Sequence, residues 1–165
     1  MKKRKSAIVI PARWGSKRLP GKPLIKIAGK PLICRVVENA LRSKLADKVI
    51  VVTDNNEIKK IAEHSGAEGV ITKKKHENGT ERILEIIDKY VYDYYINLQG
   101  DEPFINPKDV DEMINTLNKN GADIISICTQ ETVNNIKDPN KVKVVFDKNY
   151  KALYFSRSNI PYGST

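Results

Sequence analysis

The chain has 165 residues, enough for one domain with a sizeable core, and its hydrophobic (40%) and charged (30%) contents are ordinary for a soluble globular protein. No apolar run approaches the roughly 20 residues that span a bilayer, and the run after the basic start is too short for a signal peptide. The two cysteines lack metal spacing and are too few for a disulfide framework, so we interpret Cys34 and Cys128 as small core residues. We expect one cytoplasmic domain over residues 1–165 with no membrane partner.

The positive charge is concentrated at the start of the chain. Of the 29 lysines and arginines, 11 precede the first acidic residue, Glu38, so the rest of the chain carries about −2 although the whole carries +9. A surface that is basic throughout is typical of nucleic-acid binding, whereas a basic first segment on a near-neutral body fits a small polyanion better. We interpret residues 1–5 as a flexible basic terminus in solvent and expect no nucleic-acid partner.

Apolar runs and helix signals alternate along the chain. In chain order they predict a strand at 7–10, a helix at 31–42, a strand at 48–53, a helix at 56–64, a weak strand at 70–71, a helix from 80 to about 91, a strand at 94–98, a helix from 107 to about 120 and a strand at 122–128. This alternation predicts an α/β fold with a mostly parallel sheet and helices on both faces. Near the end, residues 142–146 and 152–155 flank a turn and predict an antiparallel hairpin.

A basic loop follows the first predicted strand and contains no acid. Its cations and small residues are Arg13, Gly15, Ser16, Lys17, Arg18, Gly21 and Lys22. In an open α/β sheet, ligands lie in the crevice beyond the carboxyl ends of the strands. Glycines let backbone N–H groups approach phosphate oxygens, while lysine and arginine neutralise the phosphate charge. The loop therefore predicts a phosphate site.

An acidic segment, Gln99-Gly100-Asp101-Glu102-Pro103, follows the strand at 94–98. Asp101 falls at the carboxyl edge of the sheet, where a carboxylate suits Mg²⁺ that also binds phosphate oxygens. Taken alone, the segment is equally typical of a turn with solvated acids. With the basic loop on the same edge, it predicts a nucleotide site in which Asp101 is the metal ligand.

Two further polar segments lie at the start of a helix and the end of a strand. Thr80 is interpreted most simply as a helix N-cap, but the same turn would also suit a base or ribose, with Arg82 near phosphate. Arg157, just past the hairpin, is either a surface cation or a bidentate partner of a substrate carboxylate. The chain has no Walker or GxGxxG pattern and no Ser/His/Asp nucleophile signature.

The motifs occur in a specific order. They are Ile10-Pro11-Ala12-Arg13, Arg18-Leu19-Pro20-Gly21-Lys22-Pro23-Leu24, Ala28-Gly29-Lys30-Pro31-Leu32, Thr53-Asp54, Gly79-Thr80-Glu81-Arg82, Gln99-Gly100-Asp101-Glu102-Pro103, Val142-Lys143-Val144-Val145 and Tyr154-Phe155-Ser156-Arg157. Nearly end to end, this series resembles the 3-deoxy-manno-octulosonate cytidylyltransferase (CMP-Kdo synthetase) family. Many sugar nucleotidyltransferases share the basic loop, but the ordered series is specific. The resemblance implies a Rossmann-like nucleotide-diphospho-sugar transferase fold.

The resemblance also implies an activity and a set of roles. The activity is Mg²⁺-dependent transfer of CMP from CTP to Kdo, with release of diphosphate, in lipopolysaccharide precursor synthesis by a homodimer. The implied roles are CTP phosphate binding for Arg13, Ser16, Arg18 and Lys22, cytosine reading for the Ala12-Arg13 backbone and Thr80, phosphate proximity for Arg82, Mg²⁺ binding for Asp101, and contacts to the acidic sugar for Gln99 and Arg157. We expect Lys22 and Asp101 to be the catalytic residues, because charge neutralisation and positioning carry such transfers.

Two departures from the family pattern and two alternatives accompany this hypothesis. Asn78 stands where the family commonly has Ser, and the family continues past the end of this chain. We therefore expect the chain to lack a C-terminal part that supplies sugar contacts, part of the dimer interface and a second metal carboxylate. The alternatives are a cytidylyltransferase for a related acid sugar, of the sialic or amino-Kdo type, and a non-catalytic module that binds nucleotides or nucleic acid.

Overall fold

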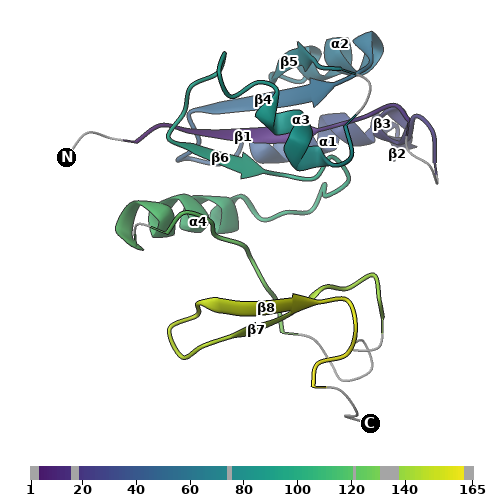
Figure 1. The fold of residues 1–165 in the computed structure, drawn as a ribbon. Coiled ribbons are helices and arrows are strands. Elements are labelled where there is room, and N and C mark those ends of the chain that lie inside the picture. Colours follow the sequence, from purple (N-terminus) through teal and green to yellow (C-terminus); the bar gives the residue numbers. More distant parts are fainter. Residues whose placement is uncertain (1–3, 16–18, 74–75, 121, 131–137, 162–165) are drawn as a thin grey trace. The chain divides into compact units, whose positions relative to one another are not determined.

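The computed structural model describes residues 4–15, 19–73, 76–120, 122–130 and 138–161. The structure divides into two compact units, Met1–Ile125 and Ser126–Thr165 (Figure 1). Across the described ranges, none of the helices combines the length and apolarity that crossing a bilayer requires.

The first unit contains a four-stranded sheet with the order β5-β4-β1-β6, in which every pairing is parallel. Its elements in chain order are β1 (Ser6–Pro11), the 3₁₀ helix η1 (Lys22–Leu24), β2 (Lys26–Ile27), β3 (Lys30–Pro31), α1 (Leu32–Ala40), β4 (Lys48–Thr53), α2 (Asn56–His64), β5 (Glu68–Ile71), α3 (Gly79–Leu84), β6 (Tyr94–Asn97) and α4 (Pro107–Asn120). The short strands β2 and β3 pair antiparallel with each other. The expected α/β sheet is confirmed.

β1 is one of the two inner strands of this sheet and is apolar on both faces. Residues 7–10 of β1 are fully buried, and the strand pairs with β4 along one edge and β6 along the other. Continuous apolar runs are typical of parallel strands that helices cover on both sides. β4 has the same character, with residues 49–53 buried.

Alternate residues of β1 face two separate cores. Ile8 and Ile10 pack in one cluster with buried residues of α1, α2 and α4. Ala7 and Val9 pack in the other with Ile83 of α3 and Ile86 beyond it. Figure 1 shows α3 in front of the sheet and α1 behind it. Helices therefore cover both faces, as the alternation of strands and helices predicts.

The helix predicted from residue 80 to about 91 is much shorter in the structure. It ends at Leu84, which is 55% exposed, and Val91, expected on its buried face, is 77% exposed. Beyond the helix the Tyr95 hydroxyl donates to the carbonyl oxygen of Tyr90 at 2.6 Å, so the backbone turns back toward the sheet. The apolar spacing was correct for a buried face near Ile83 but wrong for the length of the helix.

The strand predicted at 122–128 is also wrong. Residues 122–130 form no helix or strand, and Ile124 is 88% exposed. An apolar run becomes a strand only when a neighbouring edge supplies hydrogen-bond partners, and this segment pairs with none of the described strands. Cys128, expected in the core, is exposed, whereas Cys34 is partly buried against the core of the first unit.

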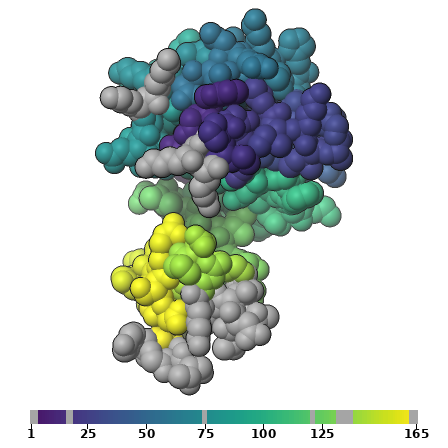
Figure 2. Space-filling view, turned by 90° about the vertical axis from the view of Figure 1, so that its right-hand side faces the viewer, coloured from purple at the N-terminus to yellow at the C-terminus, as the bar shows by residue number. Residues whose placement is uncertain are grey.

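The second unit contains the expected antiparallel hairpin. β7 (Lys143–Phe146) pairs with β8 (Ala152–Ser156), and an irregularity between Val145 and Phe146 shifts the register. Figure 2 shows the residues of this hairpin in yellow-green and yellow.

Two residues of the expected basic terminus make defined contacts. The Lys5 N–H donates to the Asp93 carboxylate at 2.7 Å, and the Asp93 N–H donates to the Lys5 carbonyl at 2.9 Å. The Arg4 guanidinium donates to the Tyr94 hydroxyl and lies 5.6 Å from the centre of its ring. Residues 1–3 of the terminus lie outside the described residues.

Asp111 on α4 fastens this helix to the turn that follows α1. Its carboxylate accepts hydrogen bonds from the Ser43 hydroxyl and from the N–H groups of Lys44 and Leu45, the latter at 3.1 Å. Burial opposes ionisation of this carboxyl, but the three hydrogen bonds outweigh it and lower the pKa of Asp111 below its ordinary value of 3.8. The ionised side chain therefore stabilises the folded state.

Asp111→Asn should lower the free energy of unfolding at neutral pH by about 1–3 kcal/mol, because backbone donors lose a charged acceptor. A lowered pKa contributes stability that is present above the ordinary carboxyl pKa and is lost as pH falls through the folded-state value. The deficit of the variant should accordingly shrink in acid. Urea unfolding at several pH values measures it, with the exposed neighbour Glu112→Gln as control. Equal deficits for the two variants would show that Asp111 has no special role.

Candidate functional site

The candidate site forms where the strand order of the sheet changes direction. β4 pairs with one edge of β1 and β6 with the other, so the loops that follow β1 and β6 leave the same edge of the sheet next to each other. In doubly wound sheets, ligands bind at this switch point, beyond the carboxyl ends of the strands. The two loops carry most of the residues that the sequence predicts for the site.

Gly100 brings these two loops into contact. A Cβ atom built on Gly100 would lie 2.9 Å from the Pro11 carbonyl oxygen and 3.6 Å from the Ala12 Cβ. Because a backbone oxygen cannot move aside as a flexible side chain can, any residue larger than glycine would push the loops apart. The buried Ala12 is held from its other side, since its N–H donates to the Val52 carbonyl at 2.9 Å. The approach at Gly100 therefore fixes the distance between the basic loop and Asp101.

Trp14 and Gly21 join the two ends of the basic loop, and we call this pair the neck of the loop. The Trp14 N–H donates to the Asp54 Oδ1 at 2.9 Å, and the Trp14 carbonyl accepts from the Gly21 N–H, also at 2.9 Å. Its ring covers Gly21, where an ideal Cβ would lie 3.2 Å from a ring carbon and where φ is +69°, so glycine is needed for both reasons. Two predicted phosphate ligands, Ser16 and Arg18, lie outside the described residues.

Lys22 and Asp101 form an ion pair between the two loops. The Lys22 ammonium donates to the Asp101 Oδ2, and the side chains are 35% and 46% exposed. Lys22 opens η1 directly after the neck of the loop, while Asp101 comes four residues after the end of β6. The two expected catalytic residues are thus in contact. A half-exposed pair of this kind adds little stability, so both side chains remain able to exchange partners.

A small pocket of about 130 Å³ lies at the same edge of the sheet and brings together three more predicted residues. Its lining consists of Pro11, Arg13, His76, Asn78, Gly79, Arg82 and Gln99. Arg13 comes from the loop after β1, Arg82 from α3 and Gln99 from the loop after β6. Two guanidinium groups facing one pocket make it a site for an anion.

Arg82 is buried although it carries a charge, with only 2% of its surface exposed. One terminal nitrogen donates to the Thr72 hydroxyl and to the Lys73 carbonyl at 3.0 Å, and the other lies 3.6 Å from the Asp54 Oδ2. Burial lowers the pKa of Arg82, Asp54 and Glu85 raise it, and the nearby Arg13 lowers it further. The guanidinium nevertheless stays charged, because its ordinary pKa lies far above neutrality.

The turn before α3 is capped by Asn78, not by Thr80 as expected. The Asn78 side-chain oxygen accepts from the Glu81 N–H at 2.9 Å, a role that a serine side chain also performs well. Thr80 lies in the first turn with its hydroxyl 3.5 Å from the Asn97 side-chain amide. The exposed Thr80 side chain is therefore not used in capping and faces the end of β6.

The acidic residues of the site fit a divalent cation only in combination with phosphate. No group of three or more His, Cys, Asp or Glu side chains suited to a metal occurs in the described part of the chain. Asp101 offers one carboxylate, which suits Mg²⁺ when phosphate oxygens and water supply the other ligands. The adjacent Glu102 is less suited, because burial and the Asp101 charge raise the pKa of its carboxyl.

Arg157 lies in the second unit. Its guanidinium donates to the carbonyl oxygens of Pro139 at 3.1 Å and Asn140 at 3.4 Å, and its own carbonyl accepts from Lys143 at 2.6 Å. These contacts brace the hairpin. The predicted residues that meet at the switch point all belong to the first unit.

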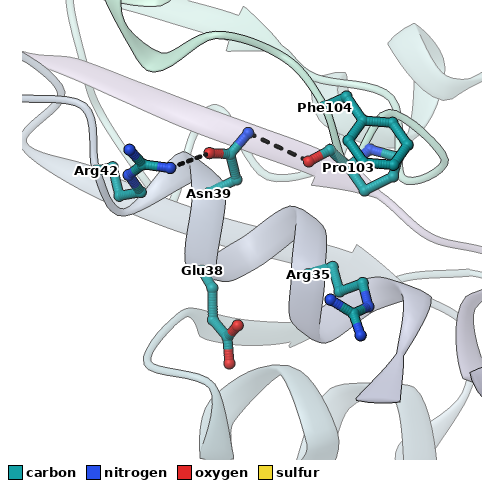
Figure 3. A pocket seen from close by; sticks show the side chains of 6 residues that line it. All are labelled: Arg35, Glu38, Asn39, Arg42, Pro103 and Phe104. Atoms are coloured by element: carbon teal, nitrogen blue, oxygen red, sulfur yellow. Dashed lines mark hydrogen bonds between the residues drawn. The ribbon is translucent and has the colours of Figure 1, made fainter. Parts of the chain in front are cut away.

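A second cavity, of about 250 Å³, lies between α1 and the segment after Asp101 (Figure 3). Its lining residues are Arg35, Glu38, Asn39, Arg42, Pro103 and Phe104. Its charges already have partners, since Arg35 donates to the carbonyls of Ile27 and Ala28 and Glu38 accepts from Lys30 at 2.8 Å. Asn39 donates to the Pro103 and Ile105 carbonyls and so holds the segment after Asp101 in place. The polar residues around this cavity therefore support neighbouring segments, and the cavity is not a second candidate site.

Sequence reasoning missed Asp54, which contacts both the basic loop and Arg82. The signal was available, because Asp54 directly follows β4 at the carboxyl edge of the sheet, the same edge at which Asp101 lies in the loop after β6. Trp14 was also missed, since its role depends on backbone bonds that no motif records.

Comparison with known proteins places the chain in a family. The family model described as cytidylyltransferase matches residues 7–165. A 3-deoxy-manno-octulosonate cytidylyltransferase of Escherichia coli is 43% identical over 159 residues, covering 96% of this chain and 65% of that protein. One from Francisella tularensis subsp. novicida (strain U112) is 48% identical over 160 residues, covering 94% of this chain and 64% of that protein.

A solved structure has the same fold. CMP:2-keto-3-deoxy-manno-octonic acid synthetase complexed with CTP matches with a TM-score of 0.87 and 42% identity, covering 96% of this chain and 66% of that one. The chain thus spans about 65% of the length of these relatives.

Gly100→Ala should destabilise the first unit by about 1–3 kcal/mol, because the new methyl group meets a backbone oxygen and forces the two loops apart. Thermal unfolding measures the loss. Gly15→Ala is the matched control, since a Cβ at Gly15 meets nothing within 4 Å. If Gly100→Ala is as stable as Gly15→Ala, the loops are not held by this contact.

Proposed function

Because the chain belongs to the cytidylyltransferase family, we propose that it binds CTP and takes part in transferring the cytidylyl group to 3-deoxy-D-manno-octulosonate, with release of diphosphate. The observation that carries this proposal is the contact of Lys22 with Asp101 at the switch point, at the same edge of the sheet as the pocket lined by Arg13, Arg82 and Gln99. This arrangement combines cations for a polyphosphate with one carboxylate for a metal. From the family we further propose a homodimer and a role in lipopolysaccharide precursor synthesis.

The triphosphate would bind between the two loops. Arg13 and Lys22 would neutralise its phosphates, together with Ser16 and Arg18 of the basic loop, and Arg82 would add charge from inside the pocket. Lys22 has three N–H donors, and a shift of its ammonium from Asp101 toward a phosphate would free that carboxylate for a metal as the nucleotide binds. A Mg²⁺ ion held by Asp101, when bound, would add positive charge beside the phosphate oxygens.

The cytosine would be read at the end of β1. The Ala12 N–H already donates to Val52, so the backbone atom of Ala12 that can serve a base is its carbonyl oxygen. Cytosine presents an amino donor at the position where uracil presents a carbonyl acceptor. A carbonyl oxygen at this place therefore favours cytosine, and the Thr80 hydroxyl would contact the base or ribose from the other side.

The transfer needs no covalent intermediate with the protein. The anomeric hydroxyl oxygen of the sugar forms a bond to the α-phosphorus, the bond from that phosphorus to the diphosphate oxygen breaks, and the hydroxyl proton is released. Arg13 and Lys22 would offset the charge that gathers on the departing diphosphate. Gln99 would contact the acidic sugar. From the family, we propose separately for the second unit that the Arg157 guanidinium pairs with the carboxylate of the sugar.

This chain should bind CTP more tightly than UTP by about 5-fold to 150-fold, since a base whose polar edge has no partner loses about 1–3 kcal/mol. Competition titration with CTP, UTP, ATP and GTP measures the order of affinities. Equal affinity for CTP and UTP would rule out cytosine reading at Ala12.

Asp101→Asn should lower Mg²⁺-dependent diphosphate release by orders of magnitude while leaving thermal stability nearly unchanged, because a half-exposed side chain keeps its size and loses its charge. Diphosphate is measured with CTP, Mg²⁺ and a panel of acidic sugars that includes Kdo, a sialic acid and amino-Kdo. Glu102→Gln is the matched control and should be mild. A normal rate for Asp101→Asn would place the metal elsewhere, and a preference for another sugar would revise the acceptor.

A further inference from the structure

We propose that Asp54 is a positioning residue of the nucleotide site, whose carboxylate fastens the neck of the basic loop and orients the Arg82 guanidinium toward the same pocket. The inference rests on the proposed function, because it assigns to Asp54 a part in CTP binding without direct contact to the nucleotide.

Asp54 touches two segments that meet at the site. It directly follows β4, and its side chain is only 12% exposed. One carboxylate oxygen accepts from the Trp14 N–H at 2.9 Å, and the other lies 3.6 Å from a terminal nitrogen of Arg82. A single carboxylate thus joins the loop after β1 to α3 across the end of β4.

The Arg82 side of this bridge balances a buried charge. The other terminal nitrogen of Arg82 is already bound to Thr72 and Lys73, and Thr72 is itself fixed through its hydroxyl, which donates to the Thr53 carbonyl at 3.1 Å. Arg82 is therefore held from behind by neutral groups, and Asp54 supplies the nearest opposite charge. Removing one partner of a buried charged pair is costly, because the remaining charge has lost its counterion.

The balance matters because a second cation faces the same pocket. Arg13 and Arg82 both line it, and their like charges repel each other in the absence of an anion. With Asp54 present, Arg82 can stay charged and face the pocket next to Arg13. Without that carboxylate, repulsion from Arg13 would favour a side-chain conformation in which Arg82 turns away from the pocket. It would also favour the binding of a solvent anion that competes with CTP.

The Trp14 side of the bridge fixes the loop. The Trp14 carbonyl accepts from the Gly21 N–H, and the Trp14 ring covers that glycine. The hydrogen bond from the Trp14 N–H to the Asp54 carboxylate therefore holds both ends of the loop at once. Arg13 immediately precedes Trp14, so the position of its backbone depends on the same bond. Trp14 is the single tryptophan of the chain and reports on this neck directly.

Two substitutions separate the two halves of the bridge. Asp54→Asn keeps an oxygen that can accept from the Trp14 N–H but removes the charge opposite Arg82. Asp54→Ala removes both. Asp93→Asn is the matched control, because the Asp93 carboxylate also accepts from a backbone N–H, that of Lys5, at the opposite end of the sheet.

The experiment measures CTP affinity by calorimetry, and hydrogen exchange of the Trp14 amide and tryptophan emission without ligand. Asp54→Asn should weaken CTP binding about tenfold or more while the Trp14 amide stays protected as in the unsubstituted protein. Asp54→Ala should weaken binding further and speed exchange of the Trp14 amide about tenfold or more, with altered emission. Asp93→Asn should change none of these.

A purely structural role would lower thermal stability in both Asp54 variants and leave the affinity of folded Asp54→Asn unchanged, which would overturn the inference. Unchanged exchange of the Trp14 amide in Asp54→Ala would also overturn it. If Asp54→Ala does not fold, Asp54→Asn decides alone. If the unsubstituted chain binds no CTP, the proposed function fails, and the Trp14 amide in the ligand-free variants still decides whether Asp54 fastens the loop.

Discussion

The backbone of Gly100 meets the carbonyl oxygen of Pro11 with no room for a side chain between them, and the geometry of the candidate site depends on this contact. β1 is paired along both edges, so Pro11 sits at the end of one of the two inner strands of the sheet. The loop after β6 packs against Pro11 through Gly100. Its Asp101 therefore reaches Lys22, and its Gln99 reaches the pocket that Arg13 and Arg82 share.

Two ion pairs lie at this edge of the sheet. Lys22 contacts Asp101, and Arg82 lies against Asp54, which leaves Arg13 exposed beside the pocket. The two pairs differ in burial, and this difference assigns them different tasks. The half-exposed Lys22–Asp101 pair can separate at little cost when a polyphosphate and a metal arrive. The buried Arg82–Asp54 pair resists separation and keeps its geometry while the other pair exchanges partners.

The parts of the fold that the sequence predicts well are those in which burial and local structure agree. The apolar runs of β1 and β4 lie between two helical layers. The helix predicted at 56–64 is capped by the residue directly before it, Asn55, which accepts from the Glu57 N–H at 2.8 Å. The rule that ligands lie beyond strand ends located the basic loop and Asp101. Residues 122–128 and the end of α3 were predicted wrongly, because an apolar pattern records burial but not the strand edge or backbone bond that decides the conformation. The roles of Asp54 and Trp14 were not predicted, because they depend on contacts between distant segments, from the Trp14 N–H to the Asp54 carboxylate and from that carboxylate to Arg82.

A crystal structure of this chain grown with CTP and Mg²⁺ tests the central claim most directly. The account predicts the triphosphate between the loops after β1 and β6, with Lys22 turned from Asp101 to a phosphate oxygen and Arg13 beside it. It also predicts the cytosine amino group at the Ala12 carbonyl. CTP bound in the cavity beside Phe104, or bound at the switch point with Lys22 still on Asp101, would contradict it.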